Sequence, residues 1–150
     1  MLIRPFSPTD LDQVLYLHRV AMEAVGAYKG DGPWDEDLKD IIRHYKDGAF
    51  LVIEEDNTLI AMGAFKPSEN NLAEVKRMRV LPSAQGKGLG KKMYLELEKR
   101  ALELGYKGFH LETSELQVSA QQLYQKVGFI ECNRMAIDGY NCILFKKYFN

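Results

Sequence analysis

The sequence contains few of the residues that mark metal-binding, disulfide-rich or membrane proteins. Its two cysteines, Cys132 and Cys142, have no Cys-x-x-Cys spacing and no histidine pair nearby. We therefore expect no metal site, and two buried reduced thiols unless both residues lie on paired strands and form a disulfide. Apolar runs fall well short of about 18 residues, so no membrane-spanning segment is expected.

A large excess of one charge is also missing. The chain has 20 Lys and Arg against 21 Asp and Glu, a formal net charge of -1, and a pI near 6.3. This balance favours neither nucleic acid nor an anionic membrane as a partner. The first residues, Met1–Pro5, lack a basic segment followed by an apolar one, so we expect no signal peptide and a cytoplasmic location.

The remaining composition is that of a soluble globular protein, with 46% hydrophobic and 27% charged residues. A length of 150 residues predicts a single domain, residues 1–150, with one core. Hydrophobic periodicity and turn residues predict the order β-α-α-β-β-β-α-β-α-β-β, an α/β (α+β) mixed sheet. The predicted strands are 2–6, 50–53, 59–65, 72–80, 109–112, 129–132 and 140–145, and the predicted helices are 7–26, 35–45, 88–104 and 118–127.

A glycine-rich turn between a predicted strand and the strongest predicted helix is the most informative segment. It reads Gln85-Gly86-Lys87-Gly88-Leu89-Gly90-Lys91. Glycines let the backbone approach a ligand closely, and the free N–H groups and dipole of a helix start favour an anion. Lys87 and Lys91 add positive charge there. The turn therefore predicts a phosphate site, although a turn that is merely tight is the alternative.

Two common phosphate motifs fit this turn poorly. A nucleoside-triphosphate P-loop needs Ser or Thr where Lys92 stands, and a first glycine where Gln85 stands. A dinucleotide fingerprint is matched by Gly86 and Gly88, with Glu112 near the position of the ribose-binding acid. However, Lys91 occupies its third glycine position. An NAD-dependent oxidoreductase is therefore kept only as a remote alternative.

Two motifs together resemble the Gcn5-related N-acetyltransferase (GNAT) family. Gln85–Gly90 matches Gln/Arg-x-x-Gly-x-Gly/Ala, and Ala120–Phe129 is similar to Ala-x-x-Leu-Tyr-x-x-x-Gly-Phe. The resemblance covers Leu72–Cys132 well and the N-terminal half only by its order of elements. It implies a mostly antiparallel sheet that is splayed at the strand before the turn. It also implies acetyl-CoA as cosubstrate and transfer of its acetyl group to an amine.

The strand before the turn has an irregular hydrophobic pattern. Leu72 shares a face with Met78 and Val80, yet Ala73 and Val75 are the apolar pair between them. The phase changes around Lys76-Arg77, and a one-residue shift is what a β-bulge produces. An exposed, simply irregular strand is the alternative. In the family, a bulge here separates two strands and leaves backbone groups free for pantetheine.

The resemblance also implies the residues that bind and use acetyl-CoA. The backbone of Met78, Arg79 and Val80 would contact pantetheine, with the backbone N–H of Met78 polarising the thioester carbonyl. The pyrophosphate would bind at Gln85, Gly86, Lys87, Gly88, Leu89, Gly90 and Lys91. Gln117 stands where the family often has asparagine, so its longer side chain changes the usual contact.

Two residues are implied as catalytic. Tyr124 would donate a proton to the departing thiolate, and packing in the core is its alternative role. Glu74 precedes Gln85 by the spacing of a catalytic glutamate found in the histone-acetylating branch. It would accept the amine proton, although a solvated strand residue is an equally good interpretation of Glu74.

The acceptor side is expected at the loop Tyr28–Trp34 and near the C-terminal hairpin. Trp34 is followed by Asp35, Glu36 and Asp37, and an aromatic ring with acids would suit a cationic amine. Alternatively, the acids favour a helix N-terminus and the tryptophan anchors the loop. Glu112 and Tyr140 are further candidates. Polyamine, aminoglycoside, amino acid, peptide N-terminus and protein lysine all remain open as acceptors.

Other classes of function are not excluded by the motifs. The chain could be a CoA-binding sensor or interaction module without catalysis, although the intact turn and Tyr124 argue against it. A hydrolase has no support, because no serine lies in a Gly-x-Ser-x-Gly elbow. The three histidines form no metal or nucleophile arrangement, and packing roles are expected for them. Homodimers are frequent in the family, but no residue pattern here identifies an interface.

Overall fold

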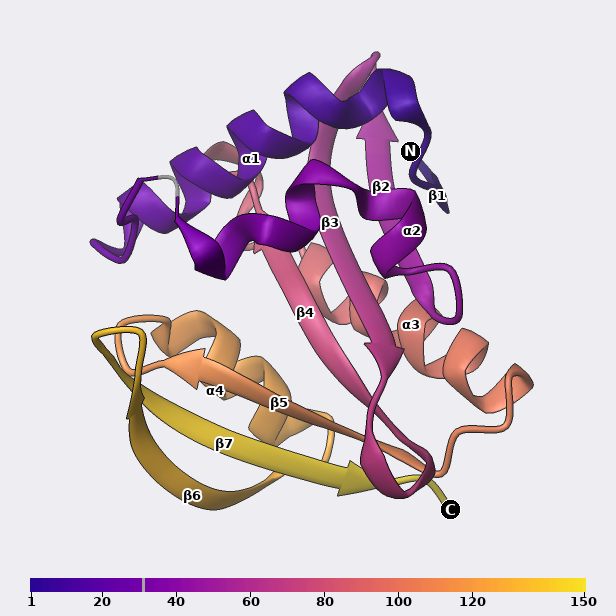
Figure 1. The fold of residues 1–150 in the computed structure, drawn as a ribbon. Helices are drawn as coiled ribbons and strands as arrows, with labels where there is room; N and C mark the ends of the chain where they lie inside the picture. The colour runs from indigo at the N-terminus through magenta and orange to yellow at the C-terminus, as the bar shows by residue number, and fades with distance from the viewer. Residues whose placement is uncertain (31) are drawn as a thin grey trace.

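A computed structural model describes residues 1–30 and 32–150, which form one seven-stranded sheet flanked by helices (Figure 1). The strand order is β1-β2-β3-β4-β5-β7-β6, and every neighbouring pair is antiparallel except β4 and β5. The strands are β1 (Leu2–Pro5), β2 (Ala49–Glu55), β3 (Thr58–Pro67), β4 (Leu72–Val80), β5 (Gly108–Ser114), β6 (Ile130–Ile137) and β7 (Tyr140–Tyr148). The α-helices are α1 (Leu11–Ala24), α2 (Ile41–His44), α3 (Leu89–Glu103) and α4 (Val118–Lys126), with 3-10 segments η1 (Pro8–Asp10), η2 (Pro33–Lys39), η3 (Glu69–Asn71) and η4 (Pro82–Ala84).

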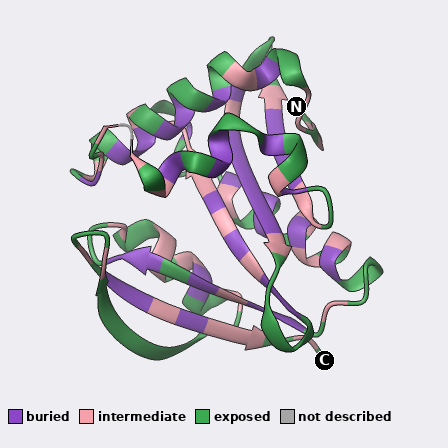
Figure 2. Ribbon diagram, viewed as in Figure 1, coloured by how far each residue is buried: buried purple, intermediate pink, exposed green. Residues whose placement is uncertain are grey.

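Helices cover both faces of the sheet, because strands β2 and β3 are apolar on both sides (Figure 2). On one face, Val14 and Leu17 of α1 pack with Val52 and Met62. On the other, α3 contributes its predicted apolar stripe of Leu89, Met93, Leu97 and Ala101 to a second cluster of buried residues. The two clusters hold the sheet between α1 and α3, and they fix where β4 ends and the glycine turn begins.

The β-bulge predicted in β4 is present. Its register with β3 shifts between Met62 and Ala64, and Arg77 has a left-handed backbone with φ 62°. Ala73 and Val75 before the bulge, and Met78 and Val80 after it, all pack against the cluster on the α3 side. The change of phase therefore preserves the apolar face of the strand, as the sequence pattern indicated.

The sheet is splayed between β4 and β5. The two strands pair only where Leu72–Glu74 lies beside Gly108–His110, and they then diverge (Figure 1). Beyond Glu74, β4 keeps only its pairing with β3, while β5 pairs along its whole length with β7. This divergence confirms the expected mixed, mostly antiparallel sheet and opens a gap beside the bulge.

The predicted helix 35–45 is wrong as one continuous element. The segment is η2 followed by the short α2, with a break at Asp40, where φ is -152°. The side chains of Asp35 and Asp37 both reach Arg77 of β4. Residues two apart on a regular α-helix do not face the same way, so these ion pairs are incompatible with a regular helix. Tertiary contacts override the local pattern here.

The C-terminal hairpin is longer than predicted, because β6 is an exposed edge strand without apolar alternation (Figure 2). Cys142 is buried on β7, but Cys132 is exposed in the irregular part of β6, so the prediction of two buried thiols is wrong for Cys132. Cys142 lies opposite Met135, and both thiols are free. The two thiols are apart because the pairing of β6 with β7 places Met135, and not Cys132, opposite Cys142.

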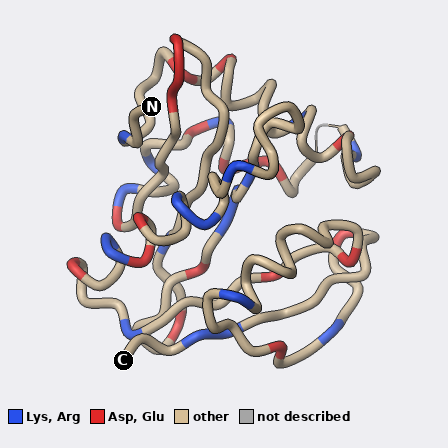
Figure 3. Tube along the Cα trace, turned by 180° about the vertical axis from the view of Figure 1, so that it is seen from behind, with Lys and Arg blue, Asp and Glu red and all other residues tan. Residues whose placement is uncertain are grey.

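Acidic and basic residues are interspersed along the chain (Figure 3). None of the described helices is long and apolar enough to cross a membrane.

Candidate active site

Two cavities meet where β4 and β5 diverge. The turn cavity, of about 450 Å³, is lined by the glycine turn, the end of β4 and α4. The hairpin cavity, of about 430 Å³, is lined by the loop before η2 and the β6–β7 turn. Five residues line both cavities and mark their junction: Met22, Met78, Arg79, Gln117 and Tyr124.

The turn cavity contains most of the residues predicted to bind CoA. These are Met78, Arg79, Val80, Gln85, Gly86, Gly88, Leu89, Gly90, Lys91, Gln117 and Tyr124. Lys87 does not line it, although it lies in the exposed turn. The side chain of Gln117 accepts a hydrogen bond from the backbone N–H of Ser114 at 3.2 Å. Its amide NH2 group remains able to donate toward the junction.

The geometry of the turn explains why an anion would bind there. Gly86 and Gly88 have left-handed backbones, with φ 81° and 77°, which glycine adopts without steric cost. α3 begins directly after Gly88, whose carbonyl accepts the N–H of Lys92. The preceding N–H groups of the first helical turn have no intrahelical acceptor, and the helix dipole adds positive potential.

Tyr124 lies at the junction of the two cavities, and its ring is also part of the core. It is 4% exposed and packs edge-on to Phe129, with ring centroids 5.5 Å apart. Burial raises the pKa of its hydroxyl, an effect that nearby Arg79 partly opposes. The hydroxyl is therefore protonated at neutral pH, and it makes no hydrogen bond within the described residues.

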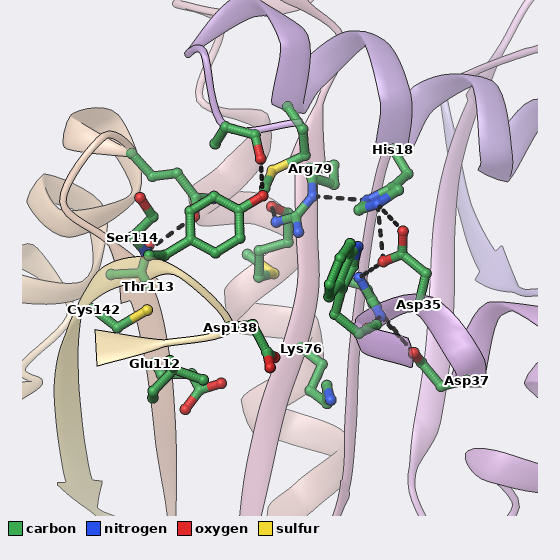
Figure 4. A pocket seen from close by; sticks show the side chains of 18 of the residues that line it. His18, Asp35, Asp37, Lys76, Arg79, Glu112, Thr113, Ser114, Asp138 and Cys142 are labelled. Atoms are coloured by element: carbon green, nitrogen blue, oxygen red, sulfur yellow. Dashed lines mark hydrogen bonds and ion pairs between the residues drawn. The ribbon is translucent and has the colours of Figure 1, made fainter. Parts of the chain in front are cut away.

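The residues predicted to bind the acceptor all line the hairpin cavity: Tyr28, Trp34, Glu112 and Tyr140. The predicted base Glu74 lines the same cavity. Burial, and then the charge of Glu74, raise the pKa of Glu112. Figure 4 places the Glu112 side chain on the side of the cavity away from His18 and Asp35. The predicted acceptor residues are thus brought together by the fold.

Contacts between the loop before η2 and the β6–β7 turn close one side of the hairpin cavity. The hydroxyl of Tyr140 donates to the carbonyl of Ala27, and the Lys29 ammonium donates to the carbonyl of Asp138. The ammonium also lies 4.2 Å from the ring centre of Tyr140 and 5.6 Å from that of Trp34. Trp34 therefore already faces a cation of the protein itself.

A buried ion-pair cluster, which the sequence pattern did not predict, underlies this cavity. Arg77 donates from Nε to Asp37 and from Nη1 to Asp35, both at 3.0 Å, and from Nη2 to the Trp34 carbonyl at 2.7 Å. Tyr45 donates to Asp37 as well. Asp35 and Asp37, the acids suggested for a cationic substrate, are both bound by Arg77 within the protein.

The charge state of this cluster follows from its contacts. Burial opposes ionisation of Asp37, but hydrogen bonds from Arg77 and Tyr45 outweigh it and lower the pKa to about 2. His18 is buried on α1 and lies 3.2 Å from Asp35, while Arg79 donates to its Nδ1 at 3.4 Å (Figure 4). Burial lowers the pKa of His18, so the ring is neutral at pH 7.

The position of Glu112 bears on the dinucleotide alternative. Glu112 lines the hairpin cavity and not the turn cavity. An acid that binds a ribose would have to lie beside the phosphate site, so the match to that fingerprint loses its acidic residue. Among residues 1–30 and 32–150, no cluster of three His, Cys, Asp or Glu side chains could hold a metal ion.

The profile of the Acetyltransferase (GNAT) family matches residues 12–129. The chain belongs to this family. The match, which covers most of the chain, confirms the resemblance inferred from the glycine turn and the Ala120–Phe129 segment. The same motifs line the turn cavity of this GNAT protein.

Curated relatives carry acetyltransferase names. The chain is 33% identical over 108 residues to the uncharacterized N-acetyltransferase YjgM of Escherichia coli K12, covering 69% of this chain and 65% of that protein. It is 35% identical over 83 residues to IAA acetyltransferase of Azospirillum brasilense, covering 55% and 54% of the two chains. The chain thus spans less than two thirds of the length of these relatives.

Solved structures share the whole fold. A GNAT acetyltransferase from Staphylococcus aureus Mu50 has a TM-score of 0.88 at 19% identity, covering 98% of both chains. The PaiA N-acetyltransferase of Thermoplasma acidophilum, solved with coenzyme A, has a TM-score of 0.80 at 25% identity, covering 99% of this chain and 98% of that one. These similarities confirm the predicted fold of this GNAT protein.

Proposed function

We propose that this GNAT protein transfers the acetyl group of acetyl-CoA to a primary amine of a small molecule or peptide. The observation that carries the proposal is the meeting of two cavities at Tyr124. One cavity offers helix-start N–H groups to an anion, and the other offers polar side chains to an acceptor. Family membership and relatives solved with CoA or acetyl-CoA support this assignment.

In this proposal, the turn cavity binds the cosubstrate. The backbone N–H groups at Gly86, Gly88 and Gly90 hold the pyrophosphate, and Lys91 adds charge. The unpaired edge of β4 at Met78–Val80 and the free amide NH2 of Gln117 hydrogen-bond pantetheine. Acetyl-CoA supplies an activated acyl group, and these contacts orient it toward the junction.

The reaction requires a polarised carbonyl, a neutral amine and a proton for the leaving thiolate. The backbone N–H of Met78 beside the bulge polarises the carbonyl. Tyr124 donates its proton to the thiolate, consistent with a hydroxyl that is protonated at neutral pH. Glu74, which lines the hairpin cavity, accepts the amine proton directly or through water.

The first experiment compares thermal unfolding with acetyl-CoA, CoA, NAD and ATP. A ligand at 100 times its dissociation constant adds about 2.7 kcal/mol to the free energy of unfolding, which is a measurable shift. We expect shifts with the two CoA ligands alone, followed by thiol release when amines are screened. If acetyl-CoA binds but none of the amines gives thiol release, the protein is instead a CoA-binding module without catalysis.

The role of Tyr124 is tested by Tyr124→Phe, which keeps the packing against Phe129. Loss of a general acid lowers kcat by about 100-fold or more, while the affinity for acetyl-CoA stays close to that of the wild type. Steady-state kinetics and the acetyl-CoA thermal shift measure the two effects separately. An unchanged kcat would leave Tyr124 with a packing role only.

A further inference from the structure

The side chain of Arg79 is a positioned cation at the junction of the two cavities. Its Nε donates to Nδ1 of His18 at 3.4 Å, and its Nη1 donates to the carbonyl of Met78 at 2.9 Å. A guanidinium carries five N–H donors in a planar fork, so further donors remain available to a ligand. None of them pairs with a carboxylate within residues 1–30 and 32–150.

A chain of hydrogen bonds keeps Arg79 in place. Arginine can only donate, so Nδ1 of His18 must accept, and the proton on Nε2 then points to Asp35. Asp35 is itself held by Arg77 at 3.0 Å. The guanidinium is therefore oriented before any ligand arrives, which reduces the ordering cost of binding.

The same cluster leaves Arg79 without a direct carboxylate contact. The nearby acids Asp35 and Asp37 both pair with Arg77. Burial, and then the charge of Arg77, lower the pKa of Arg79 to about 10, so it remains charged at neutral pH. A guanidinium without a direct carboxylate contact keeps donors for an anion, and a bound anion would offset part of its burial cost.

We propose that the acceptor is an α-amino acid whose carboxylate binds the Arg79 guanidinium. This proposal rests on the acetyltransferase function proposed above and specifies its substrate class. Arginine pairs with a carboxylate through two parallel hydrogen bonds, which fixes the orientation of the ligand. Arg79 and Tyr124 line both cavities, so a carboxylate bound at Arg79 lies beside the reacting centre. The amine must then be separated from the carboxylate by very few bonds.

The other acceptor classes fit this arrangement less well. A polyamine would bring a second cation to Arg79, and a peptide N-terminus has no free carboxylate on its first residue. The acidic side chains of Glu112 and Asp138 lie away from Arg79 in the hairpin cavity (Figure 4). Neither acid therefore competes with a ligand carboxylate for the Arg79 guanidinium.

The test compares matched acceptors in a thiol-release assay with acetyl-CoA. Each α-amino acid of the panel is measured beside its amide and its decarboxylated amine. We expect the wild type to favour the amino acid by at least about 100-fold in kcat/KM, and Arg79→Met to remove most of this preference. The preference is the ratio of the two kcat/KM values measured for one variant, so an effect of the substitution on acetyl-CoA binding cancels. Arg79→Lys should retain part of the preference, because it keeps the charge without the fork.

A control and a binding measurement complete the design. Arg100→Met removes a cation on α3 that lines neither cavity, and it should leave the preference unchanged. With CoA saturating, an N-acetylated amino acid should raise the unfolding midpoint of the wild type but not of Arg79→Met. Where Arg79→Met does not fold, Arg79→Lys and Arg79→Gln serve in the same assays.

Three outcomes would overturn the proposal, and they are distinguishable. If the amides or plain amines are as good as the amino acids for the wild type, the carboxylate is not recognised, although acetyl transfer stands. If Arg79→Met slows every acceptor and the hydrolysis of acetyl-CoA by one factor, Arg79 acts on the thioester. If acetyl-CoA binds but no acceptor releases thiol, the proposed acetyltransferase function itself fails.

Discussion

Arg77 has a backbone conformation that L-residues avoid, and its side chain shows how this cost is offset. A left-handed φ of 62° costs about 1–2 kcal/mol. In this position the guanidinium reaches Asp35, Asp37 and the carbonyl of Trp34. The strained residue of the bulge is thus the residue that fixes the segment after the Tyr28–Trp34 loop against the sheet.

Replacing Arg77 with Met should strongly destabilise the protein. The change leaves two carboxylates buried without their partner, for which a loss of about 3–5 kcal/mol is typical. Denaturant unfolding measures the loss. Arg43→Met, which breaks an exposed pair with Asp40, is the matched control and should leave the unfolding midpoint unchanged within error. Equal effects of both substitutions would show that the buried cluster adds no stability.

The same cluster predicts a loss of stability in acid. Despite burial, contacts with Arg77 and Tyr45 hold the pKa of Asp37 at about 2, below its ordinary value of 3.8. Because the folded-state pKa is depressed, the stabilisation is present above about pH 4. As the pH falls toward 2, Asp37 takes up a proton and its contribution to the free energy of unfolding drops by roughly 2 kcal/mol.

Unfolding free energies measured from pH 5 to pH 2 test this prediction. Asp37→Asn should be less stable at pH 5 and should lose stability less steeply below pH 4, because residue 37 no longer takes up a proton. A slope as steep as that of the wild type would assign the acid loss to other carboxylates, such as Asp10 beside Arg4.

At the scale of elements, the connection from β4 to α3 combines two functions in one short turn. Two left-handed glycines lead into α3, and the first residues of that helix line the turn cavity. A side chain at Gly88 would meet no other atom of the protein within 4 Å. A side chain at Gly88 would therefore lower stability through the left-handed backbone, and it would also crowd a ligand bound at the turn.

Gly88→Ala should thus lower stability by about 1 kcal/mol and also weaken acetyl-CoA binding. Gly105→Ala is the matched control, since Gly105 also has a left-handed φ, 89°, with open space around it and lies outside both cavities. Thermal unfolding with and without acetyl-CoA separates the two effects. If both variants bind acetyl-CoA equally well, the turn is not the pyrophosphate site.

At the scale of the whole molecule, the sheet consists of two parts, β1–β4 and β5–β7–β6, joined through a short pairing. Among the described residues, strands of the two parts pair only where Leu72–Glu74 lies beside Gly108–His110. At the opposite end of the gap, Tyr140 contacts Ala27 and Lys29 contacts Asp138. The hairpin cavity lies between these two connections, so its width depends on both.

Tyr140→Phe removes one of the contacts across the gap while keeping the ring. We expect a higher KM for the acceptor, an unchanged KM for acetyl-CoA, and a loss of about 1 kcal/mol in stability. Amide hydrogen exchange at residues 27–30 should become faster. Tyr148→Phe, on the same strand but 62% exposed, should change none of these. An unchanged acceptor KM in Tyr140→Phe would separate this contact from substrate binding.

Local chemistry explains what could be predicted from the sequence. The glycine turn, the Ala120–Phe129 segment and the phase change at Lys76-Arg77 each depend on residues that are neighbours in the chain. These features predicted the family, the bulge and most of the residues that line the turn cavity. The same local reasoning misjudged the segment 35–45 and the exposure of Cys132, where long-range pairing decides the outcome.

Only the tertiary structure decided which charges are free. Arg77 and Arg79 are two residues apart and look equivalent in the sequence, yet one is neutralised by acids forty positions away and the other has no such partner among the described residues. The structure also decided that Glu112 belongs to the hairpin cavity and that Tyr124 faces both cavities. The physical reason is that ion pairing and burial depend on distances in space, which the splay between β4 and β5 sets and no local pattern encodes.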